Sequence, residues 1–263
     1  MITAGVDVGN KYTKVLIFKE NDIAGKGIVE SGFNQKKAAE EALSEALKDA
    51  RLQRDDLQFV LTTKSGAAEV PFANGTITDI SAAARGAFKL FPQARTVADV
   101  GSEEVRVLKM DDRGRVVDFT INDKCAAGTG SFLEAMCDAL ETPLEEIGSL
   151  SLQSEKAVPM NAQCAVFAES EVISLIHART PKTDIARAIH DAMASRISSM
   201  VRRVGLQKEM VLIGGVAYNP GFVKAMEEDL SITLLLPDEP EYVSALGAAI
   251  AAAEKAGQPN KTR

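Results

Sequence analysis

The sequence predicts an α/β fold made of two duplicated halves, and three observations support this prediction. First, the pattern Asp-Val-Gly followed by a polar residue occurs at Asp7 and again at Asp99, 92 positions later. Second, each copy ends an apolar segment and is followed by two further segments that have strand character and are separated by turns. Third, helical segments follow the strands in both halves, as in α/β proteins. Such a repeat indicates internal duplication.

The individual elements follow from periodicity and from turn residues. Alternating or continuous apolar runs predict strands, and apolar residues three and four positions apart predict helices. For the first half we expect strands at 2–8, 12–18, 23–30 and 57–62, and helices at 35–52 and 78–91. For the second half we expect strands at 96–102, 104–110, 115–121, 209–215 and 231–237, and helices at 130–141, 164–178, 184–205, 219–230 and 243–256.

Composition indicates a soluble globular protein without a nucleic-acid or membrane partner. The 263 residues are 46% hydrophobic and 25% charged, carry a net charge of −7, and include only scattered basic residues. No apolar run is long enough to span a bilayer, and MITAGVDVGN lacks the features of a signal peptide, so we expect a cytoplasmic protein. The three cysteines are an odd number without a Cys-x-x-Cys pair, which argues against a disulfide framework.

The two Asp-Val-Gly segments have the properties of phosphate-binding loops. A tight glycine turn lets backbone N–H groups approach a phosphate, and an aspartate at the end of the preceding strand can hold hydrated Mg²⁺. We expect the loops to bind the β- and γ-phosphates, with Asp7 and Asp99 as catalytic residues and Asp99 orienting the attacking water. The candidate residues are Asp7, Gly9, Asn10, Thr13 and Lys14 in the first loop and Asp99, Gly101 and Ser102 in the second.

A third glycine turn completes a nucleotide-binding pattern. Gly214 and Gly215 follow the strand at 209–215, and Asn219 comes shortly before a helix. Backbone without side chains can lie flat against adenine or ribose, so the three elements together predict an ATP or ADP site. This arrangement resembles the actin, hexokinase and Hsp70 superfamily, whose ribonuclease-H-type fold is duplicated. The resemblance implies two halves around a nucleotide cleft, namely 1–94 with the returning 244–263, and 95–243.

Two of the cysteines are candidate metal ligands. Cys125 lies in the segment immediately before the helix at 130–141, and Cys164 lies at the start of the helix at 164–178. Helix N-termini carry partial positive charge and free N–H donors, which stabilise thiolates and anionic sulfide clusters. Two ligands per chain become four in a dimer, which would place one cluster between two subunits. Buried free cysteines are the alternative for both residues, and Cys137 is expected to be a core residue.

Three segments resemble a known ATPase family and favour the metal interpretation. They are NDKCAAGTG around Cys125, CAVFAESEVISLI from Cys164, and IGGVAYN around Gly214. They are similar to the ATPase activators of 2-hydroxyacyl-CoA dehydratases and the ATPase subunits of benzoyl-CoA reductase, the BadF/BadG/BcrA/BcrD type. The resemblance implies a dimer bridged by one [4Fe–4S] cluster, with Cys125 and Cys164 as ligands. Gly128 and Gly130 join the candidate cofactor-binding residues.

The same resemblance implies partners and a use for ATP. Hydrolysis would drive a low-potential electron from ferredoxin or flavodoxin into a reductase or dehydratase component, and the second ATPase subunit would be identical or homologous. The second loop departs from the family pattern Asp-Ile-Gly-Gly-Gln-Asp, because Ser102 and Glu103 replace a glycine and an amide. A carboxylate here would repel the γ-phosphate unless Mg²⁺ lies between them. This departure predicts slow hydrolysis and favours a reductase subunit over a homodimeric dehydratase activator.

Two other functions fit the same superfamily. A small-molecule kinase would need an acceptor pocket with a catalytic aspartate but no cysteine pair. An actin-like assembly protein would need a polymer interface. The two histidines, His177 and His190, lie in predicted helices, where we expect polar or capping roles in place of catalysis.

Overall fold

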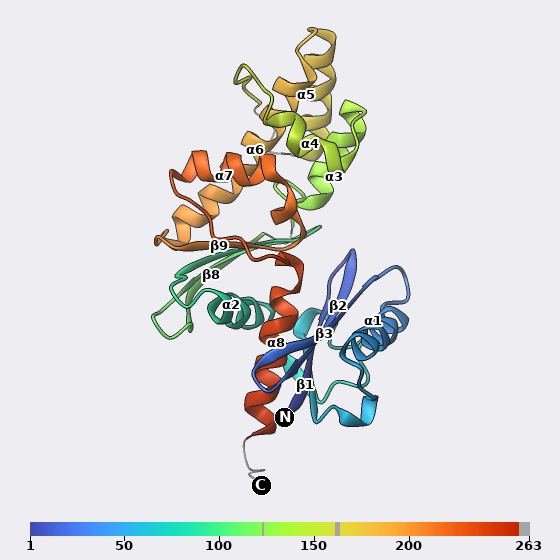
Figure 1. Ribbon diagram of the computed structural model, residues 1–263. Coiled ribbons are helices and arrows are strands. Elements are labelled where there is room, and N and C mark those ends of the chain that lie inside the picture. The colour runs from blue at the N-terminus through green and yellow to red at the C-terminus, as the bar shows by residue number, and fades with distance from the viewer. Residues whose placement is uncertain (123, 161–163, 258–263) are drawn as a thin grey trace. The chain divides into compact units, whose positions relative to one another are not determined.

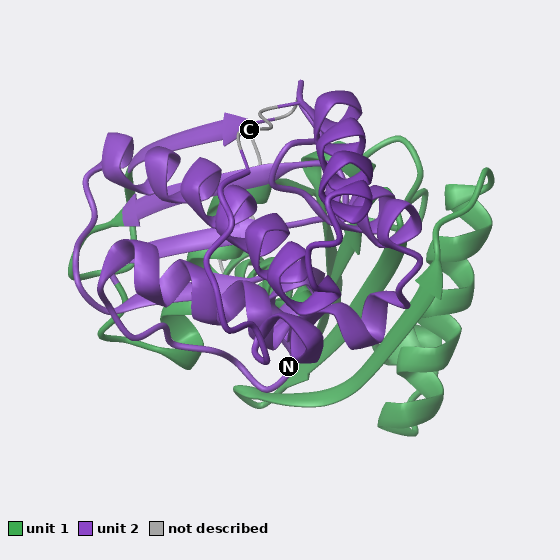
Figure 2. Ribbon diagram, turned by 90° about the horizontal axis from the view of Figure 1, so that it is seen from above, with its two compact units in different colours: residues 1–94, 110–117, 241–263 green, residues 95–109, 118–240 purple. Residues whose placement is uncertain are grey.

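The computed structural model describes residues 1–122, 124–160 and 164–257, and it contains two β-sheets with helices packed around them (Figure 1). The chain divides into two compact units, coloured separately in Figure 2. Unit 1 comprises 1–94, 110–117 and 241–263, and unit 2 comprises 95–109 and 118–240. Residues 241–257 therefore belong with the beginning of the chain, although all of unit 2 lies between them in the sequence.

Unit 1 is built on a five-stranded sheet of order β3-β2-β1-β4-β5. The first three strands are antiparallel neighbours, whereas β4 and β5 run parallel to β1. The central strand β1 is buried on both faces because α1 covers one side of the sheet and α8 the other. The elements are β1 (Ile2–Val8), β2 (Tyr12–Lys19), β3 (Asp22–Glu30), α1 (Gln35–Ala50), β4 (Phe59–Thr63), β5 (Gly75–Ile77), α2 (Asp79–Leu90) and α8 (Val243–Ala256).

The backbone of α8 rests directly on β1. A Cβ atom on Gly5, in the middle of β1, would lie 2.0 Å from the carbonyl oxygen of Ala245 and 2.3 Å from the amide nitrogen of Ala249. Only glycine allows this approach, and the alanines of α8 keep its facing surface equally small. The Thr3 hydroxyl also donates a hydrogen bond to the Ala249 carbonyl at 3.0 Å. These contacts join the two ends of the chain in one core.

In its described residues, unit 2 is built on a four-stranded sheet of order β8-β7-β6-β9 with five α-helices. Its long helix α6 buries a stripe of Ile185, Ile189, Met193 and Ile197 at successive four-residue steps. Each such side chain contributes about 1.5–3 kcal/mol through removal of apolar surface from water. The elements are β6 (Thr96–Val100), β7 (Val105–Met110), β8 (Val116–Asn122), α3 (Gly130–Leu140), α4 (Leu144–Ser151), α5 (Ala165–His177), α6 (Lys182–Val204), β9 (Met210–Ile213) and α7 (Pro220–Leu230).

The two sheets repeat one topology, which confirms the predicted duplication. In each sheet the first strand pairs antiparallel with the second and parallel with the fourth, so β6, β7, β8 and β9 repeat β1, β2, β3 and β4. Leu235 continues the repeat beyond β9, where it forms a parallel bridge with Val211. The bridge occupies the position next to β9 that β5 occupies next to β4 in unit 1.

The expected elements are present, with ends that differ from the predictions by two residues or fewer, apart from the strand at 231–237. That strand is reduced to the bridge at Leu235. The helix α4 and the three-residue strand β5 were not predicted from the sequence. An eight-residue helix with a central Gly148 is too short to be stable alone, and packing supplies its stability. A Cβ atom on Gly148 would lie 2.5 Å from Asn219 Oδ1 of the capping residue of α7. Within the described residues, no helix has the length and hydropathy needed to cross a membrane.

Candidate functional site

The first loop follows β1 and places Asp7 between two polar side chains. Lys14 Nζ lies 3.2 Å from Asp7 Oδ2, and the Thr63 hydroxyl donates to Asp7 Oδ1 at 3.2 Å. Thr63 ends β4, which runs parallel to β1, so both side chains reach the same edge of the sheet. The carboxylate is thereby fixed at both oxygens. The sequence analysis identified Asp7 and Lys14 but missed Thr63, because strand pairing alone brings it there.

The turn of the first loop is closed by a backbone hydrogen bond. The Gly9 N–H donates to the Tyr12 carbonyl at 3.0 Å, and a Cβ atom on Gly9 would lie 2.9 Å from that same oxygen. Asn10 is exposed at the tip of the turn. Thr13 is fully buried, and its hydroxyl lies 2.9 Å from Ser31 Oγ. The predicted phosphate contact of Thr13 therefore faces the interior of unit 1, which favours a role in holding the loop.

The second loop repeats this geometry after β6. The Gly101 N–H donates to the Glu104 carbonyl at 2.9 Å, which closes the turn between residues three positions apart as in the first loop. Asp99 is buried, and its Oδ2 lies 3.4 Å from Arg106 Nη1. Lys14 and Arg106 each lie seven positions after the loop aspartate and pair with it across the hairpin. That equal spacing is the sequence signal that would have identified Arg106.

Arg106 also contacts an acidic residue of the second loop. Its Nη2 bonds to the Glu104 carboxylate, so one guanidinium serves both Asp99 and Glu104. Glu103, the residue that replaces an amide of the family pattern, is exposed. The excess negative charge predicted for this loop is thus partly neutralised within the loop itself.

The third glycine turn lies against the second loop. Gly214 has a φ of +89°, and a Cβ atom there would lie 2.4 Å from the Val100 carbonyl and 2.9 Å from Asp99 Oδ1. Gly215 has open space around its Cα, so its backbone is accessible to a ligand. Asn219 caps α7, since its Oδ1 accepts the Phe222 N–H at 3.0 Å. Asn219 therefore has a structural role as the N-cap of α7, and its contact with a ligand stays a prediction.

The start of α3 is hydrogen-bonded to the second loop. The Gly130 N–H donates to the Gly101 carbonyl at 2.9 Å, and the Ser131 N–H donates to the Ser102 carbonyl at 2.8 Å. The Ser131 hydroxyl reaches the same Ser102 oxygen at 2.7 Å. Gly128, with a φ of +87°, turns the chain into this helix. The two glycines predicted to bind a cofactor thus connect the Cys125 segment to the loop.

The structure corrects the sequence argument for Cys125. Thr129 is the N-cap of α3, so Cys125 lies four positions before the cap, in an irregular segment and outside the first turn of a helix. Asn122 Nδ2 holds that segment by donating to the Cys125 carbonyl at 2.9 Å and to the Ala127 carbonyl at 3.3 Å. The intervening residues include one outside the described ranges. The helix N-terminus argument is therefore wrong for Cys125.

For Cys164 the predicted position at the start of a helix is confirmed. Cys164 is the N-cap residue of α5 and is exposed, and no side-chain hydrogen bond caps the helix there. Val166 and Phe167, in the first turn of α5, are 69% and 72% exposed, which is unusual for large apolar side chains. The thiol thus lies at a positive helix end beside an uncovered apolar surface. Among the described residues, no three His, Cys, Asp or Glu side chains form a metal-binding group.

Cys137 is a core residue, as predicted. It is 4% exposed on α3. Burial raises the pKa of its thiol to about 12, and the nearby Asp138, Glu134 and Glu145 carboxylates contribute to this rise in pKa. The thiolate that a metal requires is therefore strongly disfavoured at Cys137.

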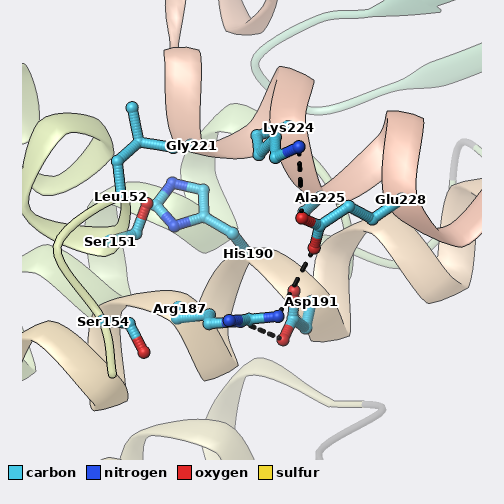
Figure 3. Close-up of a pocket in the computed structure, with 10 residues that line it drawn as sticks. All are labelled: Ser151, Leu152, Ser154, Arg187, His190, Asp191, Gly221, Lys224, Ala225 and Glu228. Atoms are coloured by element: carbon cyan, nitrogen blue, oxygen red, sulfur yellow. Dashed lines mark hydrogen bonds and ion pairs between the residues drawn. The ribbon is translucent and has the colours of Figure 1, made fainter. Parts of the chain in front are cut away.

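A small cavity of about 90 Å³ lies between α4, α6 and α7 (Figure 3), and the predicted site residues are not among those that line it. Its charged side chains are paired with one another: Arg187 lies 3.4 Å from both Asp191 and Glu228, and Lys224 lies 3.3 Å from Glu228. His190 lines the cavity and donates from Nδ1 to the Ala186 carbonyl at 2.7 Å. Burial lowers the pKa of His190 to about 4, so the ring is neutral near pH 7. This hydrogen bond gives His190 the expected polar role, although the residue lies in the interior of α6 and caps neither end.

Comparison with known proteins identifies the family. The family model for the BadF/BadG/BcrA/BcrD ATPases matches residues 4–252. The chain belongs to the BadF/BadG/BcrA/BcrD ATPase family. As a member of this family it is an ATPase.

Relatives that are named for an enzyme system align with nearly the whole chain. A 2-hydroxyisocaproyl-CoA dehydratase activator from Clostridioides difficile is 38% identical over 99% of this chain and 98% of its own. One of the subunits of the benzoyl-CoA reductase from Thauera aromatica is 33% identical over 95% of this chain and 92% of its own. These two proteins represent the two classes that the sequence motifs indicate.

Solved structures establish the fold. The Clostridium difficile activator with bound ADPNP is 37% identical, has a TM-score of 0.92, and the alignment covers 100% of both chains. A ROK-family glucokinase from Streptomyces griseus is 12% identical with a TM-score of 0.57 over 97% of this chain and 100% of its own, a likeness of fold alone. The predicted duplicated actin- and hexokinase-like fold is confirmed.

Proposed function

We propose that this ATPase couples ATP hydrolysis to low-potential electron transfer into a 2-hydroxyacyl-CoA dehydratase or a benzoyl-CoA reductase component. The observation that carries the proposal is the hydrogen bonding between the second loop and the start of α3. Three bonds from Gly130 and Ser131 attach this loop to the helix that follows the Cys125 segment. A change of nucleotide at the loop would therefore act on a segment that carries a metal-ligand candidate.

The nucleotide part of the proposal rests on the paired loops and on the ADPNP bound to a relative. Asp7, held by Lys14 and Thr63, would fix a hydrated Mg²⁺. Asp99 would orient the attacking water, and the loop amides would bind phosphate oxygens. Gly214 and Gly215 would receive the adenosine. The assignment of both loops to one nucleotide comes from the duplicated sequence pattern.

The electron-transfer part rests on the chemistry of the cysteines. Cys164 offers an exposed thiol at a helix N-terminus, and Cys125 is partly exposed, whereas Cys137 is buried with a pKa of about 12. Two available thiols in one chain fit a [4Fe–4S] cluster that takes two ligands from each of two subunits. When bound, such a cluster accepts and passes on one electron at a time. The chain's own residues would bind it, orient it through α5 and expose it beside Val166 and Phe167.

The relatives support the choice of partner. The dehydratase activator and the reductase relative both belong to enzymes whose named substrates are acyl-CoA thioesters. We propose that the electron received by this ATPase, from a ferredoxin or a flavodoxin, passes to a component of that class. The chain itself would pair with an identical or homologous ATPase subunit.

The test is anaerobic purification followed by three measurements on one preparation. We expect binding of ADP by calorimetry, hydrolysis of MgATP, and visible iron–sulfur absorption that dithionite bleaches. Nucleotide binding without iron after anaerobic reconstitution would refute electron transfer. Phosphorylation of a small alcohol by colourless protein would replace the proposal with a kinase function, and sedimenting filaments with ATP would replace it with an assembly function.

A further inference from the structure

We infer that Ser31 is a positioning residue for the first phosphate loop. Ser31 directly follows β3 and is only 2% exposed, and no sequence motif includes it. Its hydroxyl donates to the Gly9 carbonyl at 2.6 Å, and its backbone N–H donates to the Lys11 carbonyl at 2.9 Å. Ser31 therefore holds the turn that joins β1 and β2 from the side opposite its tip. The inference rests on the proposed nucleotide site.

The hydroxyl geometry fixes the direction of a short hydrogen-bond relay. A serine hydroxyl has one proton to donate, and Ser31 directs it to the Gly9 carbonyl. The contact of 2.9 Å between Thr13 Oγ1 and Ser31 Oγ must then have Thr13 as its donor. Thr13 and Ser31 are both buried, so neither hydroxyl can exchange this partner for bulk water. The relay runs from Thr13 to Ser31 to Gly9.

This relay orients the peptide unit at the tip of the loop. In a trans peptide the carbonyl and the N–H point in opposite directions. Because the Gly9 carbonyl is turned inward to Ser31, the N–H of Asn10 in the same peptide unit is turned outward. A phosphate-binding loop acts through such outward N–H groups. Without the Ser31 hydroxyl, this peptide unit would be free to rotate and would present either dipole end to the ligand.

Ser31 acts through Gly9 and not by contact with the ligand, so its effect should appear in affinity for phosphates. We expect Ser31→Ala to raise the Kd for ADP and the KM for MgATP about five- to tenfold, the loss of one buried hydrogen bond to the loop. The kcat should change less than twofold, because Asp7 and Asp99 are unaltered. Ser31→Thr keeps the hydroxyl and should restore the affinity.

A matched control separates positioning from general stability. Thr3 is also fully buried, and its hydroxyl also donates to a backbone carbonyl, that of Ala249, in the same sheet but away from the loop. Thr3→Val should lower the melting temperature of the nucleotide-free protein about as much as Ser31→Ala and leave the Kd for ADP unchanged.

The outcomes distinguish this inference from the proposed function. Wild-type protein that binds ADP, with Ser31→Ala binding equally well, would overturn the role of Ser31 and leave the ATP site intact. An equal loss of affinity in Thr3→Val would reduce Ser31 to a stability residue. Wild-type protein that binds no nucleotide would overturn the proposed function and this inference together.

Discussion

Arg106 lies between the carboxylates of Asp99 and Glu104, and its side chain is only 19% exposed. A guanidinium can donate to two carboxylates at once because its donors are arranged in a planar fork. Hydrogen bonds to charged, partly buried groups are stronger than exposed ion pairs. At the scale of single residues, Arg106 thus balances the acidic departure of the second loop.

Removal of Arg106 should impair nucleotide binding. In Arg106→Gln the carboxylates of Asp99 and Glu104 lose their shared cation and would repel the phosphates. We expect the KM for MgATP to rise about tenfold or more, in line with about 1.5–3 kcal/mol for a hydrogen bond to a charged group. Steady-state hydrolysis measures the effect.

Arg187→Gln is the control, because Arg187 also bridges two carboxylates, those of Asp191 and Glu228. This group contains no residue of either phosphate loop. Equal KM values in both variants would contradict this role of Arg106.

His190 should make stability depend on pH. Burial lowers its folded-state pKa from 6.5 to about 4, so the unfolded state binds a proton more readily than the folded state. The resulting stability is fully present above pH 6.5 and is lost as the pH falls toward 4. The loss at pH 5 amounts to about 2 kcal/mol, obtained by integrating the linkage relation.

Urea unfolding at pH 7 and pH 5 checks this prediction. His190→Gln should flatten the change in unfolding free energy between the two pH values, whatever its effect at pH 7. His177→Gln, at an exposed position on α5, should leave the wild-type change in place. The chain has two histidines, so the pair of variants covers every imidazole. A wild-type stability that is equal at both pH values would contradict the buried neutral state of His190.

At the scale of elements, sequence periodicity predicted nearly every helix and strand, because apolar spacing depends on local sequence. The alanine-rich helix α8 was placed at its observed bounds, Val243–Ala256. What the sequence could not provide is the pairing of strands that are distant in the chain. Thr63 reaches Asp7 through β4, and Ser31 reaches Gly9 through the end of β3. Such contacts depend on strand register, which no single segment encodes.

The error at Cys125 concerns how far the influence of a helix N-terminus reaches along the chain. The sequence suggested a helix shortly after Cys125, and the helix is there, but Gly128 and Thr129 set its start. Thr129 accepts from the Phe132 N–H as the N-cap, and its own hydroxyl donates to the Ala126 carbonyl at 2.6 Å. The predicted start at residue 130 was correct, so the error lay in counting Cys125, five residues earlier, as part of the helix N-terminus.

The contact between α8 and β1 gives a prediction for an element. A Cβ atom on Gly5 would lie 2.0 Å from the Ala245 carbonyl oxygen, so Gly5→Ala must push α8 away from the sheet. We expect a loss of about 3 kcal/mol in unfolding free energy, the upper end of the cost of overpacking. Urea unfolding followed by circular dichroism measures it.

Gly75→Ala in β5 is the control for Gly5→Ala. There the nearest atom to an added Cβ is Leu61 Cδ2 at 3.4 Å, a side-chain atom at ordinary contact distance. This variant should change the unfolding free energy by less than about 1 kcal/mol, as expected for a partly exposed strand glycine. If both variants cost the same, α8 does not rest on β1 as closely as described.

At the scale of the whole molecule, the proposed cluster requires each chain to supply half of a four-thiolate site. Cys164 is exposed and Cys125 is partly exposed, whereas Cys137 is enclosed in the core of unit 2. The uncovered Val166 and Phe167 beside Cys164 provide apolar surface that a second subunit would bury. Cluster binding and subunit association should therefore occur together.

This coupling predicts matching losses of iron and of the dimer. Wild-type protein reconstituted without oxygen should hold about two iron atoms per chain, that is, one four-iron cluster for two chains. Cys164→Ser should lose the iron and shift the native mass toward the monomer. Cys137→Ala removes a thiol that burial holds protonated, so it should keep both the iron and the dimer. Iron retention by Cys164→Ser, or iron loss specific to Cys137→Ala, would assign the ligands differently. A dimer that persists without iron would show that the apolar surface at Val166 and Phe167 is sufficient for association.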